Sequence, residues 1–119
     1  MAKILVVEDE EDIVEFIRTT LAPLKHEITH CNDGAKALSA MKKEKFDLFL
    51  LDIMIPGIDG YSILLELERD DTSRSVPCIV MSALQPAQKL FDRFERVKYF
   101  IVKPFSAKDL VQKVSDIIK

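Results

Sequence analysis

The stretch FDLFLLDIMIPGIDGY, residues 46–61, decides the fold of this 119-residue chain. It opens with a continuous apolar run, 46–51, which ends on Asp52 and is typical of a strand buried on both faces of a sheet. The dipeptide Pro56-Gly57 that follows suits a type II turn. A helical repeat of apolar residues then begins at Tyr61. The stretch therefore predicts a strand, a turn and a helix in direct succession.

The same alternation of apolar runs and helix-like periodic segments continues along the chain. Strands are predicted at residues 3–7, 26–31, 46–51, 76–81 and 99–102. Helices are predicted over 13–24, 35–41, 61–67 and 87–95, and from 106 nearly to the end. Because strands that are apolar throughout need cover on both faces, the pattern predicts an α/β, doubly wound (βα)5 fold with a five-stranded parallel sheet.

Length and composition narrow the class of protein. At about 150 residues per domain, the chain predicts a single domain over residues 1–119. The 17 basic and 20 acidic residues give a formal net charge of −3, which argues against direct nucleic-acid binding. Since no apolar run approaches the roughly 18 residues that span a bilayer, no membrane association is expected. The short N-terminal apolar run leads into acids and does not resemble a signal peptide.

The cysteines and histidines offer no metal site. Cys31 and Cys78 lie far apart without a CxxC motif, and two thiols form neither a disulfide framework nor a zinc site. We expect both to be small buried hydrophobes in a reducing compartment, which points to the cytoplasm. His26 and His30 have HxxxH spacing, but four residues of a strand span about 13 Å. They cannot share one ion and are expected at the surface or on an edge strand.

Polar side chains follow the predicted strands at the points where these end. Parallel strands bring their carboxyl ends to one edge of the sheet, where ligands bind in doubly wound folds. Each of these residues alone would more often be a helix cap or a solvated surface group; the constellation favours a site. The residues expected at this edge are Glu8, Asp9, Asp52, Ser82 and Lys103.

This set of side chains suits phosphoryl transfer. Three neighbouring carboxylates repel one another unless a cation lies among them, and a site with only oxygen ligands suits Mg²⁺ better than zinc. Lys103 is a point charge for a phosphoryl oxygen, and Ser82 can donate to another. Asp52 is the candidate nucleophile, because a carboxylate is already ionised at neutral pH.

The sequence also resembles the receiver domain of two-component response regulators, the CheY-like family, over essentially its whole length. The matching pieces are ILVVEDE, FDLFLLDIMIPGIDGY, IVMSA and VKPF, in that order. The resemblance implies a flavodoxin/CheY-like fold and a cytoplasmic phosphorelay signalling module. Such a module is not an enzyme beyond its own phosphotransfer and autodephosphorylation. The sequence leaves two arrangements open: a complete single-domain regulator or a receiver cut from a longer protein.

The same resemblance implies roles for the acidic residues. Asp52 would accept a phosphoryl group from a histidine kinase or a histidine phosphotransfer protein. Mg²⁺, or Mn²⁺, would be bound by Asp9, Asp52 and the backbone carbonyl of Met54, with Glu8 acting mostly through metal-bound water. The phosphorylated module would then act on a downstream effector protein or an output domain.

For the other site residues the resemblance implies binding and switching. Ser82 and Lys103 would bind the phosphoryl oxygens, and Lys103-Pro104 matches the family's cis peptide bond. Phe100 matches the aromatic switch position, which turns inward as the hydroxyl residue moves toward the phosphoryl group. One departure is that residues 95–99, ERVKY, stand where the family often has a Gly-Ala-Asp-Asp-like turn.

Four aromatic residues cluster in the sequence before and within the last strand, namely Phe91, Phe94, Tyr99 and Phe100. Core packing explains most of such a cluster, and a face for docking a partner is the alternative. We prefer Phe100 as the member of the cluster that takes part in docking.

Two other functions fit the sequence less well. A phosphatase of the haloacid-dehalogenase type would form an aspartyl phosphate but needs an acid/base Asp two residues after the nucleophile, where this chain has Met54, and a cap domain. A flavodoxin-like electron carrier would need a phosphate-binding loop rich in Ser, Thr and Gly after the first strand. Acids occupy that position instead and would repel an anionic cofactor.

Overall fold

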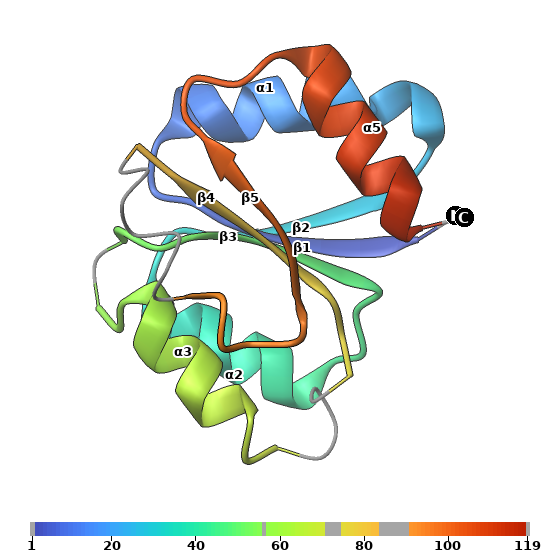
Figure 1. Cartoon of the computed structure of the whole chain (residues 1–119). Coiled ribbons are helices and arrows are strands. Elements are labelled where there is room, and N and C mark those ends of the chain that lie inside the picture. The colour runs from blue at the N-terminus through green and yellow to red at the C-terminus, as the bar shows by residue number, and fades with distance from the viewer. Residues whose placement is uncertain (1, 56, 71–74, 84–90, 119) are drawn as a thin grey trace.

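The computed structural model describes residues 2–55, 57–70, 75–83 and 91–118. Five parallel strands form one sheet in the order β2-β1-β3-β4-β5 (Figure 1). This order confirms the predicted doubly wound fold, with the topological switch point between β1 and β3. The strands are β1 (Lys3–Val7), β2 (Glu27–Cys31), β3 (Leu48–Asp52), β4 (Cys78–Ser82) and β5 (Val97–Val102).

Helices cover both faces of the sheet, as Figure 1 shows. In the described parts of the chain they are α1 (Glu11–Leu21), α2 (Gly34–Lys43), α3 (Gly60–Leu67) and α5 (Ala107–Ile117), with a 3₁₀ turn (Ala22–Leu24) after α1. The helix predicted over 87–95 falls largely on residues 84–90, which lie outside the described residues, and 91–96 is mostly turn. No helix among the described residues is both long and apolar enough to cross a membrane.

Alternate side chains of each strand enter two separate cores. Leu5 and Phe49 pack with α2 and α3 on one face, whereas Ile4 and Leu50 pack with α1 and α5 on the other. All five residues of β3 are buried for this reason. The uninterrupted apolar run that predicted this strand is thus the direct result of two covered faces.

Several boundaries and burials differ from the sequence-based expectations. β3 begins at Leu48; Asp47, just before it, accepts the Lys3 N–H of β1 with its carboxylate at 2.8 Å. β4 begins after Pro77, which has no N–H to give to a strand ladder. Phe16 of α1 is 38% exposed instead of buried, and its ring meets the edge of Phe105 at 5.9 Å.

The edge position of β2 explains the environments of the cysteines and histidines. Cys78 on central β4 is fully buried, and burial raises its pKa to about 12. Cys31 on β2 is only half-buried, so the prediction that both cysteines are buried is wrong for Cys31, since an edge strand has a neighbour on one side only. His30 lies within this edge strand and His26 just before it, as expected.

Three glycines hold the segment after Asp52 in place. A Cβ atom on Gly34, the first residue of α2, would overlap the backbone carbonyl of Ile58. Gly57 has a φ of 87°, the left-handed value that the third position of the predicted type II turn requires. At the start of α3, the Gly60 N–H donates to the Ile53 carbonyl at 3.2 Å. Backbone contacts therefore fix the segment that follows Asp52.

Substituting Gly34 with alanine should lower the free energy of unfolding by about 1–3 kcal/mol, because the added methyl group must displace the backbone at Ile58. Urea unfolding followed by circular dichroism measures the change. Ser39→Ala, on the exposed side of α2, is the control and should stay within about 0.5 kcal/mol of the parent. Equal stability of the two variants would contradict the close approach.

Candidate functional site

The carboxyl edge of the sheet brings together the residues that the sequence placed at strand ends. Asp52 closes β3 and Ser82 closes β4, and both are almost completely buried. Glu8 directly follows β1, which neighbours β3 in the sheet. Lys103 follows β5, and its backbone N–H donates to the Ser82 carbonyl at 2.8 Å.

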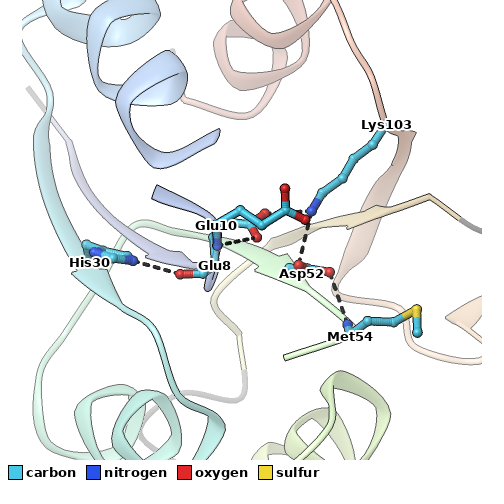
Figure 2. Close-up of polar contacts among 6 residues, drawn as sticks. All are labelled: Glu8, Glu10, His30, Asp52, Met54 and Lys103. Atoms are coloured by element: carbon cyan, nitrogen blue, oxygen red, sulfur yellow. Dashed lines mark hydrogen bonds and ion pairs between the residues drawn. The ribbon is translucent and has the colours of Figure 1, made fainter. Parts of the chain in front are cut away.

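A single ammonium group connects the buried carboxylates. Lys103 Nζ lies 2.7 Å from Glu8 Oε1 and 3.1 Å from Asp52 Oδ2 (Figure 2). The side chains of Glu8 and Asp52 are 0% and 5% exposed, so this contact joins three strand ends in an environment with little water. Two buried carboxylates of like charge require such a partner.

Burial and charge act against each other on this group of residues. The pKa of Glu8 is raised to about 7, chiefly because burial desolvates the carboxylate; the hydrogen bond from Lys103 lowers this pKa, and the proximity of Asp52 raises it. For Lys103, burial alone would lower the pKa, but the hydrogen bonds to Glu8 and Asp52 outweigh it and the pKa is raised. The Glu10 N–H donates to Glu8 Oε2 at 3.1 Å. His30 Nε2 contacts the Glu8 carbonyl oxygen at 2.7 Å (Figure 2).

Both oxygens of the Asp52 carboxylate have a partner. Oδ2 contacts Lys103, and Oδ1 accepts the Met54 backbone N–H at 3.0 Å. The Met54 side chain is 62% exposed and points away from Asp52 (Figure 2). The carboxylate is thus held in one orientation at the end of a rigid central strand.

Three consecutive acids converge beside Asp52 at this edge. Glu8, Asp9 and Glu10 each offer a carboxylate oxygen, and the three atoms lie within 4.8 Å of one another. Asp9 and Glu10 are exposed, and Glu10 makes no side-chain cap to α1 although it stands at the N-cap position. Sequence reasoning named Glu8 and Asp9 but missed Glu10; the run of three acids was the available signal. An all-oxygen set of this kind suits a hard divalent cation.

The expected switch residues lie on neighbouring strands. Phe100 stands opposite Val80 in the β4–β5 register and is half-buried, with its ring centroid 6.3 Å from that of Phe91. The Lys103-Pro104 bond is cis, as the resemblance implied.

The structure separates the aromatic residues that cluster in the sequence. Phe91 and Phe94 are buried in the core under α2 and α3, and Phe100 packs against the same core. Tyr99 faces the other core, and its hydroxyl donates to Asp116 of α5 at 2.9 Å. Core packing therefore accounts for Phe91 and Phe94, and Tyr99 belongs to a different surface from Phe100.

An apolar hollow of about 550 Å³ opens beside Lys103. Its walls come from the start of α1 and from the segment after β5. Glu10 and Asp12 lie at its border, and its apolar lining includes Ile13, Phe16, Pro104 and Phe105.

Comparisons with known proteins agree with this geometry. A sequence model described as the response regulator receiver domain matches residues 4–115. A probable transcriptional regulator, ycf27, of Porphyridium aerugineum is 34% identical over 118 residues, which cover 98% of this chain and 48% of that protein. The transcriptional activator protein PfeR of Pseudomonas aeruginosa is also 34% identical, over 98% of this chain and 38% of its own length. The chain therefore spans about half the length, or less, of these curated relatives.

Solved structures of receiver domains superpose on almost the entire chain. The receiver domain of a sensor histidine kinase from Pseudomonas aeruginosa, with magnesium in its active site cleft, has a TM-score of 0.87 and 28% identity, covering 98% of this chain and 97% of that one. The response regulator TrrA of Thermotoga maritima, in complex with Mg²⁺ and BeF, has a TM-score of 0.86 and 28% identity, covering 99% and 100%. Since the family match runs from the first strand into the last helix, this chain belongs to the receiver domain family of two-component response regulators.

Proposed function

We propose that Asp52 is the phosphoacceptor of a phosphorelay and that its phosphorylation switches a surface that docks a partner. The observation that carries this proposal is the buried Asp52 carboxylate, held between the Lys103 ammonium and the Met54 N–H at the carboxyl edge of the sheet. An Asp52 oxygen would attack the phosphorus of a phosphohistidine. The P–N bond breaks, and its electron pair and a proton remain on the imidazole of the donor.

The neighbouring side chains are suited to holding the product. Phosphorylation converts the Asp52 carboxylate, with one negative charge, into an acyl phosphate with about two, and adds three phosphoryl oxygens at this edge. Lys103, which contacts Asp52 already, would move with the charge to a phosphoryl oxygen. Ser82 at the end of the adjacent strand would donate its hydroxyl hydrogen to another.

The acids beside Asp52 are suited to Mg²⁺, and Mn²⁺ would fit the same oxygen ligands. Asp9, Asp52 and the Met54 carbonyl would bind the ion, with Glu8 acting through water. The convergence of the Glu8, Asp9 and Glu10 oxygens supports this, as does the magnesium in the two solved relatives. When bound, the ion neutralises charge that develops on the phosphoryl oxygens.

The chain's own chemistry ends with this transfer and with loss of the phosphoryl group by autodephosphorylation. A phosphatase acting on other substrates is disfavoured, because the side chain two residues after Asp52 is the thioether of Met54, which cannot serve as acid or base. The family's role is a signalling domain, not a classical enzyme.

The partners follow from the same proposal. A histidine kinase or histidine phosphotransfer protein would supply the phosphoryl group, and the apolar hollow beside Lys103 offers it a contact surface next to Asp52. An effector protein or an output domain would receive the signal, since the curated relatives are transcriptional regulators longer than the matched region. We place this relay in the cytoplasm, where the two free cysteines would stay reduced.

Incubation with acetyl phosphate and Mg²⁺ should add one phosphoryl group to the parent chain, as measured by intact-mass spectrometry. Asp52→Asn should abolish the addition, because the amide is not nucleophilic and the shape of the side chain is kept. Asp92→Asn, at an exposed aspartate away from this edge, should be labelled like the parent. Full labelling of Asp52→Asn would refute the assignment.

Mg²⁺ affinity should depend more on Asp9 than on Glu8. Asp9 is exposed and available as a direct ligand, whereas Glu8 is buried and already paired with Lys103. Asp9→Asn should weaken Mg²⁺ binding by at least about tenfold, and Glu8→Gln by less. Titration of the Met54 amide resonance measures both, with Glu11→Gln on α1 as the control for net charge. Equal losses in the two site variants would contradict the ranking.

Ser82→Ala should separate phosphoryl binding from switching. Beryllofluoride, a phosphoryl mimic, should still bind with Mg²⁺ because Asp52 and the acids are intact. The Phe100 ring resonances should shift clearly in the parent but barely in Ser82→Ala, since the hydroxyl is absent. Ser115→Ala, on the exposed side of α5, should respond like the parent. Identical Phe100 shifts in Ser82→Ala and the parent would show that the hydroxyl does not drive the switch.

A further inference from the structure

Two arginines of one short segment hold the two ends of α3. The Arg93 Nη1 atom donates to the Tyr61 hydroxyl, in the first turn of α3, at 2.8 Å. Arg96 Nε lies 3.3 Å from Glu68 Oε2, at the C-cap of the same helix. Residues 91–96, coloured orange in Figure 1, thus run alongside α3. We call this segment the strap.

Between these polar contacts, the strap packs its aromatic side chains on α3. The Tyr61 ring meets Phe91 edge-on at 5.8 Å and Phe94 at 5.4 Å. The Arg93 guanidinium also lies over the Phe94 ring, 5.5 Å from its centroid. Phenylalanine and arginine each recur at a spacing of three residues in FDRFER, so the phenylalanines enter the core while the arginines bind α3.

The contact at the Glu68 end differs from an ordinary surface ion pair in the burial of its arginine. The Arg96 side chain is 3% exposed, so water and salt screen its charge less than they screen an exposed pair. Lys42 of α2 and Glu66 of α3 form such an exposed pair, at 3.6 Å with 41% and 46% exposure. Glu66 and Glu68 are equally exposed, and only Glu68 is paired with a buried arginine.

The strap and α3 together contact both the residue after Asp52 and the expected switch residue, Phe100. The Gly60 N–H of α3 donates to the carbonyl of Ile53, the residue after Asp52. At the other side, Phe91 of the strap is 6.3 Å from Phe100. Because Phe100 and Tyr61 both pack on Phe91, we expect a change in the position of Phe100 to displace Phe91, and with it Tyr61.

We propose that the strap and α3 move as one unit when Phe100 moves, so that the surface that responds to phosphorylation includes α3. Leu65, 38% exposed on that helix, would report the movement of this surface. The inference rests on the proposed function, because phosphorylation is the event that would move Phe100. The contacts between the strap and α3 are present without phosphorylation. The contact of Arg96 with Glu68 also gives a structural role to one residue of ERVKY, 95–99, the segment that departs from the family's usual turn.

The test uses the double variant Tyr61→Phe/Glu68→Gln, which removes one hydroxyl and one charge and keeps both shapes. Methyl and ring resonances are recorded with and without Mg²⁺ and beryllofluoride. In the parent, Phe100 and the Leu65 methyls should both shift. In the double variant Phe100 should still shift, and the Leu65 shift should fall by more than half. Glu66→Gln is the matched control and should behave like the parent.

An unchanged Leu65 shift in the double variant, or no Leu65 shift in the parent when Phe100 shifts, would overturn the proposal. Absence of any response at the Met54 amide would instead count against the proposed function. The strap is then tested without a phosphoryl mimic, by hydrogen exchange of the α3 amides. Exchange should be about fivefold faster in the double variant and unchanged in Glu66→Gln, as expected for loss of a hydrogen bond. Equal exchange in all three proteins would overturn the strap itself.

Discussion

The ion pairs of Lys103 with Glu8 and Asp52 are the constraint on which the rest of this site depends. A carboxylate without a partner is costly to bury, and breaking a buried pair typically costs about 3–5 kcal/mol. Lys103 therefore fixes the ends of β1, β3 and β5 relative to one another, at distances of 2.7 and 3.1 Å. One ammonium does not fully balance two carboxylates, and burial, with the nearby Asp52 adding to it, raises the pKa of Glu8 despite the hydrogen bond from Lys103. The charge of the proposed phosphoryl group would change this balance directly.

The backbone at Asp52 and in the segment after it is firmly held. Asp52 ends a strand that is buried throughout, and the segment after it is held by the close approach of Ile58 to Gly34 and by the Gly60 hydrogen bond. The new charge would therefore be accommodated by side chains rather than by the Asp52 backbone. Ser82 and Lys103 lie on the neighbouring strand ends, and the shared packing of Phe100, the strap and α3 offers a route by which their movement reaches the surface.

The sequence predicted much of the architecture because the strong signals were local. Apolar runs that end on polar residues located all five strands within about two residues, and their lack of alternation indicated helices on both faces. The errors occurred where burial depends on neighbours that the sequence does not show. Cys31 is half-buried because its strand lies at the edge, and Phe16 is exposed although it fits the helical repeat. Tyr99 and Phe100, adjacent in sequence, face opposite cores because side chains alternate along a strand.

By itself the sequence determined which residues reach the functional edge, since parallel strands deliver their final residues to the same side of a sheet. Glu8, Asp52, Ser82 and Lys103 could be named for this reason. Only the tertiary structure decided how they interact. Lys103 lies between two carboxylates, and Glu8 is buried beside an exposed Asp9. Arg93 and Arg96 contact α3. These arrangements depend on long side chains that meet across elements distant in the sequence. Such contacts are set by the packing of whole helices and strands, so the local sequence does not identify the partner of each side chain.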